Sequence, residues 1–159
     1  MQRVLLKLSI LGIILATGCA SIDRWTAGKI TEGIPRLRDK LPRNVKMYFA
    51  DPINVRGYVL HERSRKQVQD AFTKAFGAID VNYSTETNGC NYALHVVVEN
   101  WEYGDAGFLG KGDRDSIAMA VLLRDMKTNR ILTRSSLYAW NLELLVEEYV
   151  KTLFEDDKQ

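Results

Sequence analysis

The sequence predicts an α/β (α+β) fold, a two-layer sandwich with two helices on one face of a mixed sheet of about four to five strands, in the order β-α-β-β-β-α. Three observations predict it. Apolar residues alternate over 45–49, as in a half-buried strand. Three further strand-like segments follow one another over 92–140. Apolar side chains also recur at helical spacing over 68–76 and 142–153, which predicts two amphipathic helices.

The amino-terminal segment, residues 1–18, has the layout of a cleaved secretory signal peptide. Arg3 supplies a positive charge, an apolar run follows over 4–16, and small residues lead directly into Cys19. This region resembles the bacterial lipobox, whose cysteine becomes the lipidated first residue because its thiol accepts the diacylglyceryl group. An uncleaved membrane anchor and an ordinary signal peptide are the alternatives, although the run is shorter than the ~20 residues that span a bilayer.

Residues 19–44 are interpreted as the lipidated cysteine and a tether. Ala20, in place of Asp, implies the outer membrane by the sorting behaviour of such lipoproteins, with the domain facing the periplasm. Helical spacing is interrupted by Gly33 and Pro35, so any helix would start near Pro35. Fully extended, the tether would reach roughly 80 Å, at about 3.3 Å per residue.

A single α/β domain is expected over residues 45–159. Ser64 and Gln67 have the spacing of a capping box, which predicts a helix that starts there, and Gly77 is suited to end it. A short strand is expected over 79–83. Three strands then form a meander over 92–101, 117–124 and 131–140. The middle strand is nearly all apolar, so we expect it to be buried on both faces.

Two asparagines in this part of the sequence predict local structure. Asn129 suits a left-handed turn position, and Asn141 is suited to cap the last helix. In the strand over 92–101, simple alternation places Leu94, Val96 and Val98 on one face, with Ala93, His95, Val97, Glu99 and Trp101 on the other.

The charge balance excludes some classes of partner. Removal of residues 1–18 takes Arg3 and Lys7 from the 22 basic residues and none of the 20 acidic ones, so 20 of each remain and the formal net charge is zero. A nucleic-acid binder would need a basic surface, and a polybasic membrane patch is excluded for the same reason. We therefore expect the protein to bind the membrane through its amino-terminal lipid alone.

No convincing catalytic, metal or cofactor site emerges from the motifs. The glycine-rich segment 104–112 lacks the spacing of a phosphate-binding loop. The acidic residues around it have neither the regular spacing of a calcium loop nor a clear glycosidase pairing: Glu99, Glu102, Asp105, Asp113 and Asp115. His95 has Ser116 and Ser135 as sequence-compatible partners, without a nucleophile-elbow pattern around either. We expect no enzyme activity, no cofactor and no metal.

Four side chains are candidate contacts with a partner or the membrane. Phe108 and Leu109 lie among the loop glycines and either form an exposed apolar tip or fold back over the sheet edge. Trp101 and Trp140 lie near strand ends, where they either cap the core or stand at its rim. Cys90, the second cysteine, is interpreted as a small buried or half-buried residue, with a redox role or a disulfide-linked dimer as the alternative.

The carboxyl half resembles a family of small Gram-negative outer-membrane lipoproteins whose domain has no assigned function. The shared pattern, in the order of this sequence, is Trp101-Glu102, Asp113-Arg114-Asp115, an apolar strand, Arg124-Asp125, Thr128-Asn129-Arg130-Ile131-Leu132, Leu144-Leu145, Tyr149-Val150 and Leu153-Phe154. This chain departs from the pattern by a shorter connection between Trp140 and Leu144. More distantly, the element order is similar to the amino-terminal domain of TolB and to the lipoproteins CsgG and PelC.

Those distant relatives are envelope assembly or secretion components, and some form rings beneath the outer membrane. The resemblance implies a non-enzymatic scaffold or accessory protein that binds another envelope protein. The alternative is a ring-forming accessory subunit for secretion of a polysaccharide or a fibre, which would associate with copies of itself. An envelope hydrolase that uses His95 or the Glu102 and Asp113 region is the least favoured interpretation.

Overall fold

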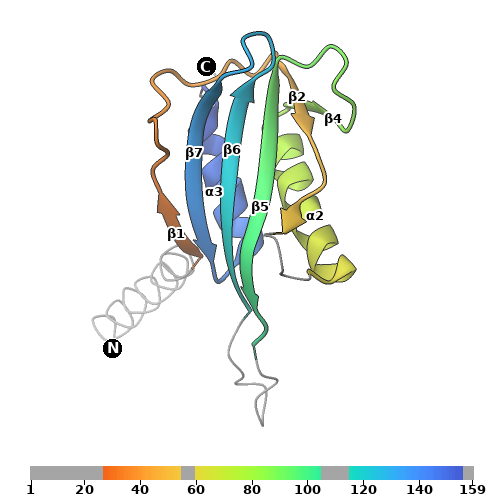
Figure 1. Cartoon of the computed structure of the whole chain (residues 1–159), viewed down its shortest axis with the longest axis vertical. Coiled ribbons are helices and arrows are strands. Elements are labelled where there is room, and N and C mark those ends of the chain that lie inside the picture. Colours follow the sequence, from red (N-terminus) through yellow and green to blue (C-terminus); the bar gives the residue numbers. More distant parts are fainter. Residues whose placement is uncertain (1–26, 55–59, 105–114, 156–159) are drawn as a thin grey trace, which may run out of the picture.

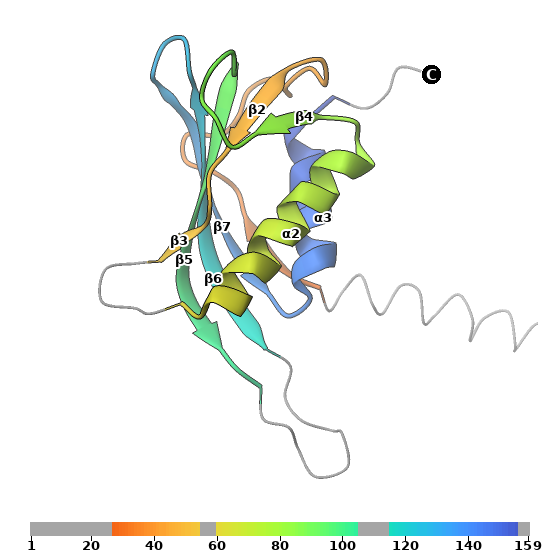
Figure 2. The ribbon, with the colours of Figure 1, turned by 90° about the vertical axis from the view of Figure 1, so that its right-hand side faces the viewer.

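The computed structural model describes residues 27–54, 60–104 and 115–155. Over these ranges the chain forms one mixed sheet with both helices on the same side, which confirms the predicted fold class (Figure 1). Figure 2 shows this arrangement from the side, with the helices on one face of the sheet only. We call the opposite face, which no helix of the described part of the chain covers, the open face.

The sheet has more strands than the sequence indicated. Its members are β1 (Gly28–Thr31), β2 (Lys46–Phe49), β3 (Ile53–Asn54), β4 (Asn82–Ser84), β5 (Tyr92–Glu102), β6 (Ser116–Asp125) and β7 (Ile131–Ala139). They pair in the order β1-β7-β6-β5-β2-β4, and β3 pairs with β5. The strands β5, β6 and β7 pair antiparallel with one another, and β1 pairs antiparallel with β7. β2 is parallel to both β4 and β5, and β3 is parallel to β5. The predicted meander is confirmed; β1 and β3 are too short to produce a readable periodicity.

The two helices, α2 (Glu62–Ala78) and α3 (Leu142–Leu153), pack on each other and on the inner face of the sheet. Aromatic side chains join the layers: the ring of Phe49 on β2 lies 5.3 Å from Phe72 and 5.7 Å from Phe76 on α2. All three are fully buried, and burial of each such side chain stabilises the fold by roughly 1.5–3 kcal/mol. This apolar contact explains why α2 lies across the parallel part of the sheet.

One predicted helix cap is confirmed and the other is wrong. Asn141 caps α3, because its side-chain oxygen accepts a hydrogen bond from Leu144 N at 3.3 Å. The capping box at Ser64 does not form, since α2 begins at Glu62 with His61 as its N-cap. Ser64 is buried instead, and its hydroxyl is 3.0 Å from that of Tyr103 at the end of β5.

The segment expected to be a tether contributes a strand. Residues 28–31 form β1 and pair with the end of β7, so the sheet begins upstream of Val45. The helix expected near Pro35 does not form, since residues 35–44 contain no helix. Leu41 is instead buried, and its backbone N donates to Leu153 O at 2.7 Å. Nonlocal pairing outweighs the weak helical spacing here.

A bulge changes the side-chain pattern of β5. The pairing with β6 shifts register between Val98 and Asn100, which turns the residues beyond it over. Trp101 therefore lies in the core with Val98, whereas alternation predicted that it would share the face of His95. The predicted alternation is wrong beyond the bulge. In the β6–β7 turn, Asn129 has φ 57°, which confirms the left-handed position expected for it.

Candidate interaction surfaces

The start of the described chain is held at one end of the sheet, which we call the lower end. Ala27 O accepts hydrogen bonds from Trp140 N at 2.9 Å and from Asn141 N at 2.8 Å. Only seven residues lie between Cys19 and Ala27, so the eight steps of chain that join the two reach at most about 26 Å, at about 3.3 Å per residue. Cys19 itself lies outside the described residues. Any membrane anchor at Cys19 would thus be much closer to the domain than the expected 80 Å.

Four strands meet at the lower end. Gly28 of β1, Ala139 of β7, Ile117 of β6 and Trp101 of β5 form one row across the sheet by their pairing registers. Figure 1 shows this end at the bottom of the molecule, where β5 ends and β6 begins. The candidate contact residues Phe108 and Leu109 fall between these strands in sequence, outside the described residues.

Trp101 is a core residue and offers little surface to a partner. Its side chain is 5% exposed and stacks on Tyr103 with ring centres 5.8 Å apart. Its Nε1 donates to Asp115 Oδ2 at 3.1 Å, across the base of the β5–β6 hairpin. The prediction that Trp101 is a contact residue is therefore not supported, because the β5 bulge turns it inward.

Trp140 is exposed, in agreement with its selection as a candidate contact. Its side chain is 44% exposed and meets Tyr138 (37% exposed) edge-to-face, with ring centres 5.2 Å apart. Because Trp140 N also bonds Ala27 O, this aromatic pair lies beside the point where the chain arrives from Cys19. Tyrosine and tryptophan rings, which are apolar but carry one polar group, are favoured where an apolar environment meets water.

The acidic residues of the β5–β6 hairpin that the structure describes are engaged in hydrogen bonds or an ion pair within the fold. Asp115 accepts from Trp101 Nε1 and from Gly104 N, and Glu102 accepts from Ser116 Oγ at 3.1 Å. Glu99 lies 3.7 Å from Arg134 on β7. Asp105 and Asp113 lie outside the described residues. Within the described ranges, no group of three or more acidic, histidine or cysteine side chains could hold a metal ion.

His95 lies on the open face without a catalytic partner among the residues the structure describes. It contacts Tyr48 edge-on, with ring centres 5.9 Å apart, and its partial burial and the nearby Arg124 lower its pKa. Ser135 belongs to the inner face of the sheet, and Ser116 is bonded to Glu102. The serines named as possible nucleophiles are thus not presented to His95.

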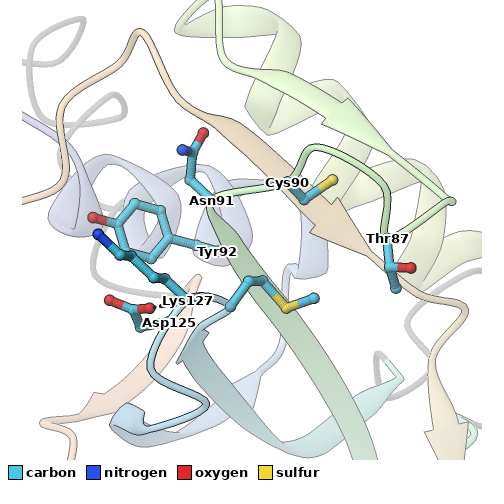
Figure 3. Close-up of a pocket in the computed structure, with 7 residues that line it drawn as sticks. Thr87, Cys90, Asn91, Tyr92, Asp125 and Lys127 are labelled. Carbon is cyan, nitrogen blue, oxygen red and sulfur yellow. Dashed lines mark hydrogen bonds between the residues drawn. The ribbon is translucent and has the colours of Figure 1, made fainter.

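A surface pocket of about 380 Å³ lies at the upper end of the sheet (Figure 3). It is lined by Thr87, Cys90, Asn91, Tyr92, Asp125, Met126 and Lys127. The half-buried thiol of Cys90 donates to Glu86 O at 3.2 Å, in keeping with the small-residue interpretation. Asp125 accepts hydrogen bonds from Thr128 N and Lys127 N; the first of these is the main reason why the pKa of Asp125 is lowered, and both shape the turn. The thiol of Cys90 and the carboxylate of Asp125 are thus bonded to backbone groups close in sequence.

The open face is the surface that sequence reasoning missed. Its centre carries half-exposed apolar side chains from adjacent strands, namely Tyr48, Val97, Ala118 and Leu122, and Ile53 on β3 is 58% exposed. The apolar run of β6 predicted burial on both faces, but the helices cover only one. The signal was present in the sequence as an unusually apolar strand with only two helices to cover the sheet.

Comparison with known proteins establishes the fold. No protein-family model matches the chain, and no curated protein sequence matches it either. Two crystal structures of PelC dodecamers from Paraburkholderia phytofirmans match it at TM-scores of 0.60 and 0.58, with 16% and 17% identity. They cover 81% and 83% of this chain and 98% of the PelC chain in each case. The chain has the fold of PelC.

A third solved structure extends this PelC-like fold to a further protein. A Xanthomonas campestris protein of family DUF330 matches at a TM-score of 0.52 and 16% identity, over 70% of this chain and 86% of its own.

In the described ranges of the present protein, neither helix has the length and apolar character needed to cross a bilayer.

Proposed function

We propose that this protein is an outer-membrane lipoprotein, anchored at Cys19, whose periplasmic domain assembles with copies of itself into a ring that serves secretion of a polysaccharide or a fibre. The observation that carries the proposal is the fold, which matches PelC, a dodecamer in both crystal structures, over 98% of the PelC chain. The lipobox-like sequence before Cys19 adds the anchor.

The short connection between Cys19 and the domain supports a fixed orientation. With at most about 26 Å of chain before Ala27, the lower end of the sheet would lie close to the membrane. The exposed pair Tyr138 and Trp140 would then face the lipid headgroups, where amphipathic aromatic rings are favoured. The β4–β5 and β6–β7 connections at the upper end would point into the periplasm.

A non-enzymatic role fits the chemistry of the described residues. The acidic side chains Glu102 and Asp115 are engaged in hydrogen bonds that close the β5–β6 hairpin. His95 faces away from Ser135 across the thickness of the sheet. We propose that the domain acts as a scaffold whose surfaces bind protein and membrane.

Two measurements test the proposal. The mass of the detergent-extracted protein, by light scattering after size-exclusion chromatography, should be a several-fold multiple of the mass of one lipidated chain without residues 1–18. A monomer at all accessible concentrations would contradict the ring. Separately, radiolabelled palmitate should enter the parent protein and not Cys19→Ser, and the variant should leave the membrane fraction. If both versions fractionate alike, the anchor is wrong.

A further inference from the structure

The open face carries net positive charge around its apolar centre. By register and side-chain alternation, its basic residues are Lys29, Lys46, Arg124 and Arg134, and its acidic residues are Glu99 and Glu102. The basic excess is therefore two. One pair is neutralised within the chain, since Arg134 lies 3.7 Å from Glu99. A partner that covers this face should carry acidic side chains around an apolar contact.

The outer surface of α3 has those properties. Glu143, Glu147 and Glu148 outnumber its single basic residue, Lys151, so the helix has a net charge of −2. Leu144 lies among these carboxylates with 40% of its side chain exposed, and Glu148 follows it one turn later. An exposed leucine with an acidic rim complements an apolar sheet face with a basic rim.

The charge of the other helix points to α3 as the partner element. α2 carries Arg63, Arg65, Lys66 and Lys74 against Glu62 and Asp70, a net charge of +2. Like charges across an interface disfavour docking, so α2 would be repelled by the open face. Among the ion pairs of the described residues, one joins the two oppositely charged helices within a single copy. It is formed by Lys74 Nζ and Glu143 Oε2, which lie 2.6 Å apart.

We infer that the open face of one copy is covered by α3 of the next copy, an inference that rests on the ring proposed above. The two surfaces lie on opposite sides of the sheet, so each copy can bind one neighbour on either side. An interface between two different surfaces is head-to-tail and can close into a ring, whereas a self-complementary surface stops at a dimer. The contact would bury both faces of β6, as its apolar sequence demands.

Cross-linking tests this contact directly. The full chain with Cys90→Ser, Leu144→Cys and Ser136→Cys places one thiol on α3 and one on the open face, where Ser136 is exposed. A short bis-maleimide should give a ladder of dimers, trimers and higher species, because every copy has both halves of the contact. The matched control replaces Leu144→Cys by Asp70→Cys on the exposed surface of α2 and should stay monomeric on denaturing gels.

A charge reversal provides the second measurement. Glu148→Lys should raise the protein concentration for half-assembly by about fivefold, the effect of about 1 kcal/mol at one ion pair. Asp70→Lys makes the same charge change on α2 and should leave assembly unchanged. An oligomer that gives no ladder and is insensitive to Glu148→Lys overturns this interface while the proposed ring stands. A monomeric parent protein overturns both.

Discussion

Single residues decide how the amino-terminal strand joins the sheet. Gly28 has φ 150°, in a region that side chains rarely adopt, and it packs against the backbone of β7. A Cβ there would overlap Tyr138 O and approach Leu145 Cδ2 to 2.8 Å. The absence of a Cβ at Gly28 therefore allows β1 to lie this close to β7.

Gly28→Ala should therefore destabilise the protein by about 2 kcal/mol or more, from backbone strain and from displacement of β1. Gly77→Ala is the matched control. A Cβ at Gly77 meets nothing within 4 Å, and alanine is the better helix former by roughly 0.5–1 kcal/mol. Urea unfolding measures both. Equal effects of the two substitutions would contradict the described packing of β1.

A buried tyrosine gives a pH-dependent prediction. Burial raises the pKa of Tyr149 to about 12, and the neighbouring Ser135 offsets this only in part. Because the unfolded chain loses this proton near pH 10, the stabilising contribution of the buried Tyr149 hydroxyl is complete below pH 10 and is lost as the pH rises toward 12, by about 3 kcal/mol in all. Urea unfolding of the parent and Tyr149→Phe across this range should show the difference. Parallel pH profiles would refute the burial.

At the scale of the elements, the two helix starts differ in what fixes them. Asn141 accepts a backbone hydrogen bond at the start of α3, whereas the N-cap of α2, His61, makes no side-chain cap. Asn141→Ala should cost about 1 kcal/mol of stability. Gln67→Ala should cost almost nothing, since the capping box that would engage Gln67 does not form. If Gln67→Ala lowered the stability as much as Asn141→Ala does, the capping box of Ser64 and Gln67 would have to form after all.

The sequence predicted the elements whose signal is local. The meander β5-β6-β7 and both helices follow from periodicity over nine or more residues, so their existence and order were readable. β1 and β3 were missed because four and two residues show no period, and their pairing depends on strands far along the chain. Trp101 was placed on the wrong face because a bulge inverts the alternation.

The candidate sites were readable only in part. Trp140 was named as a candidate contact that either caps the core or stands at its rim, and its exposed side chain places it at the rim. The open face was missed because an apolar strand such as β6 is read as buried on both sides, and its sequence does not show what would cover the second side. The roles of Cys19, Phe108 and Leu109 stay predictions, since these residues lie outside the described ranges.

For the whole molecule, only seven residues would join a lipid anchor at Cys19 to Ala27 at the lower end of the sheet. In proteoliposomes the full chain should show tryptophan fluorescence quenched by brominated lipids, because Trp140 would lie at the headgroups. Trp140→Phe should remove a clear part of this quenching, whereas Trp101→Phe serves as the control because Trp101 is buried. Identical quenching in parent and Trp140→Phe would place the lower end away from the lipid.

The account as a whole depends on association of copies. The fold alone is compatible with a monomer, but the open face leaves apolar side chains such as Leu122 and Ile53 partly exposed, and contiguous exposed apolar surface marks an interaction site. Electron microscopy of the detergent-extracted, lipidated full chain tests the claim most directly. We predict closed ring-shaped particles of uniform size. Single small particles at every concentration, with the protein folded, would contradict the account.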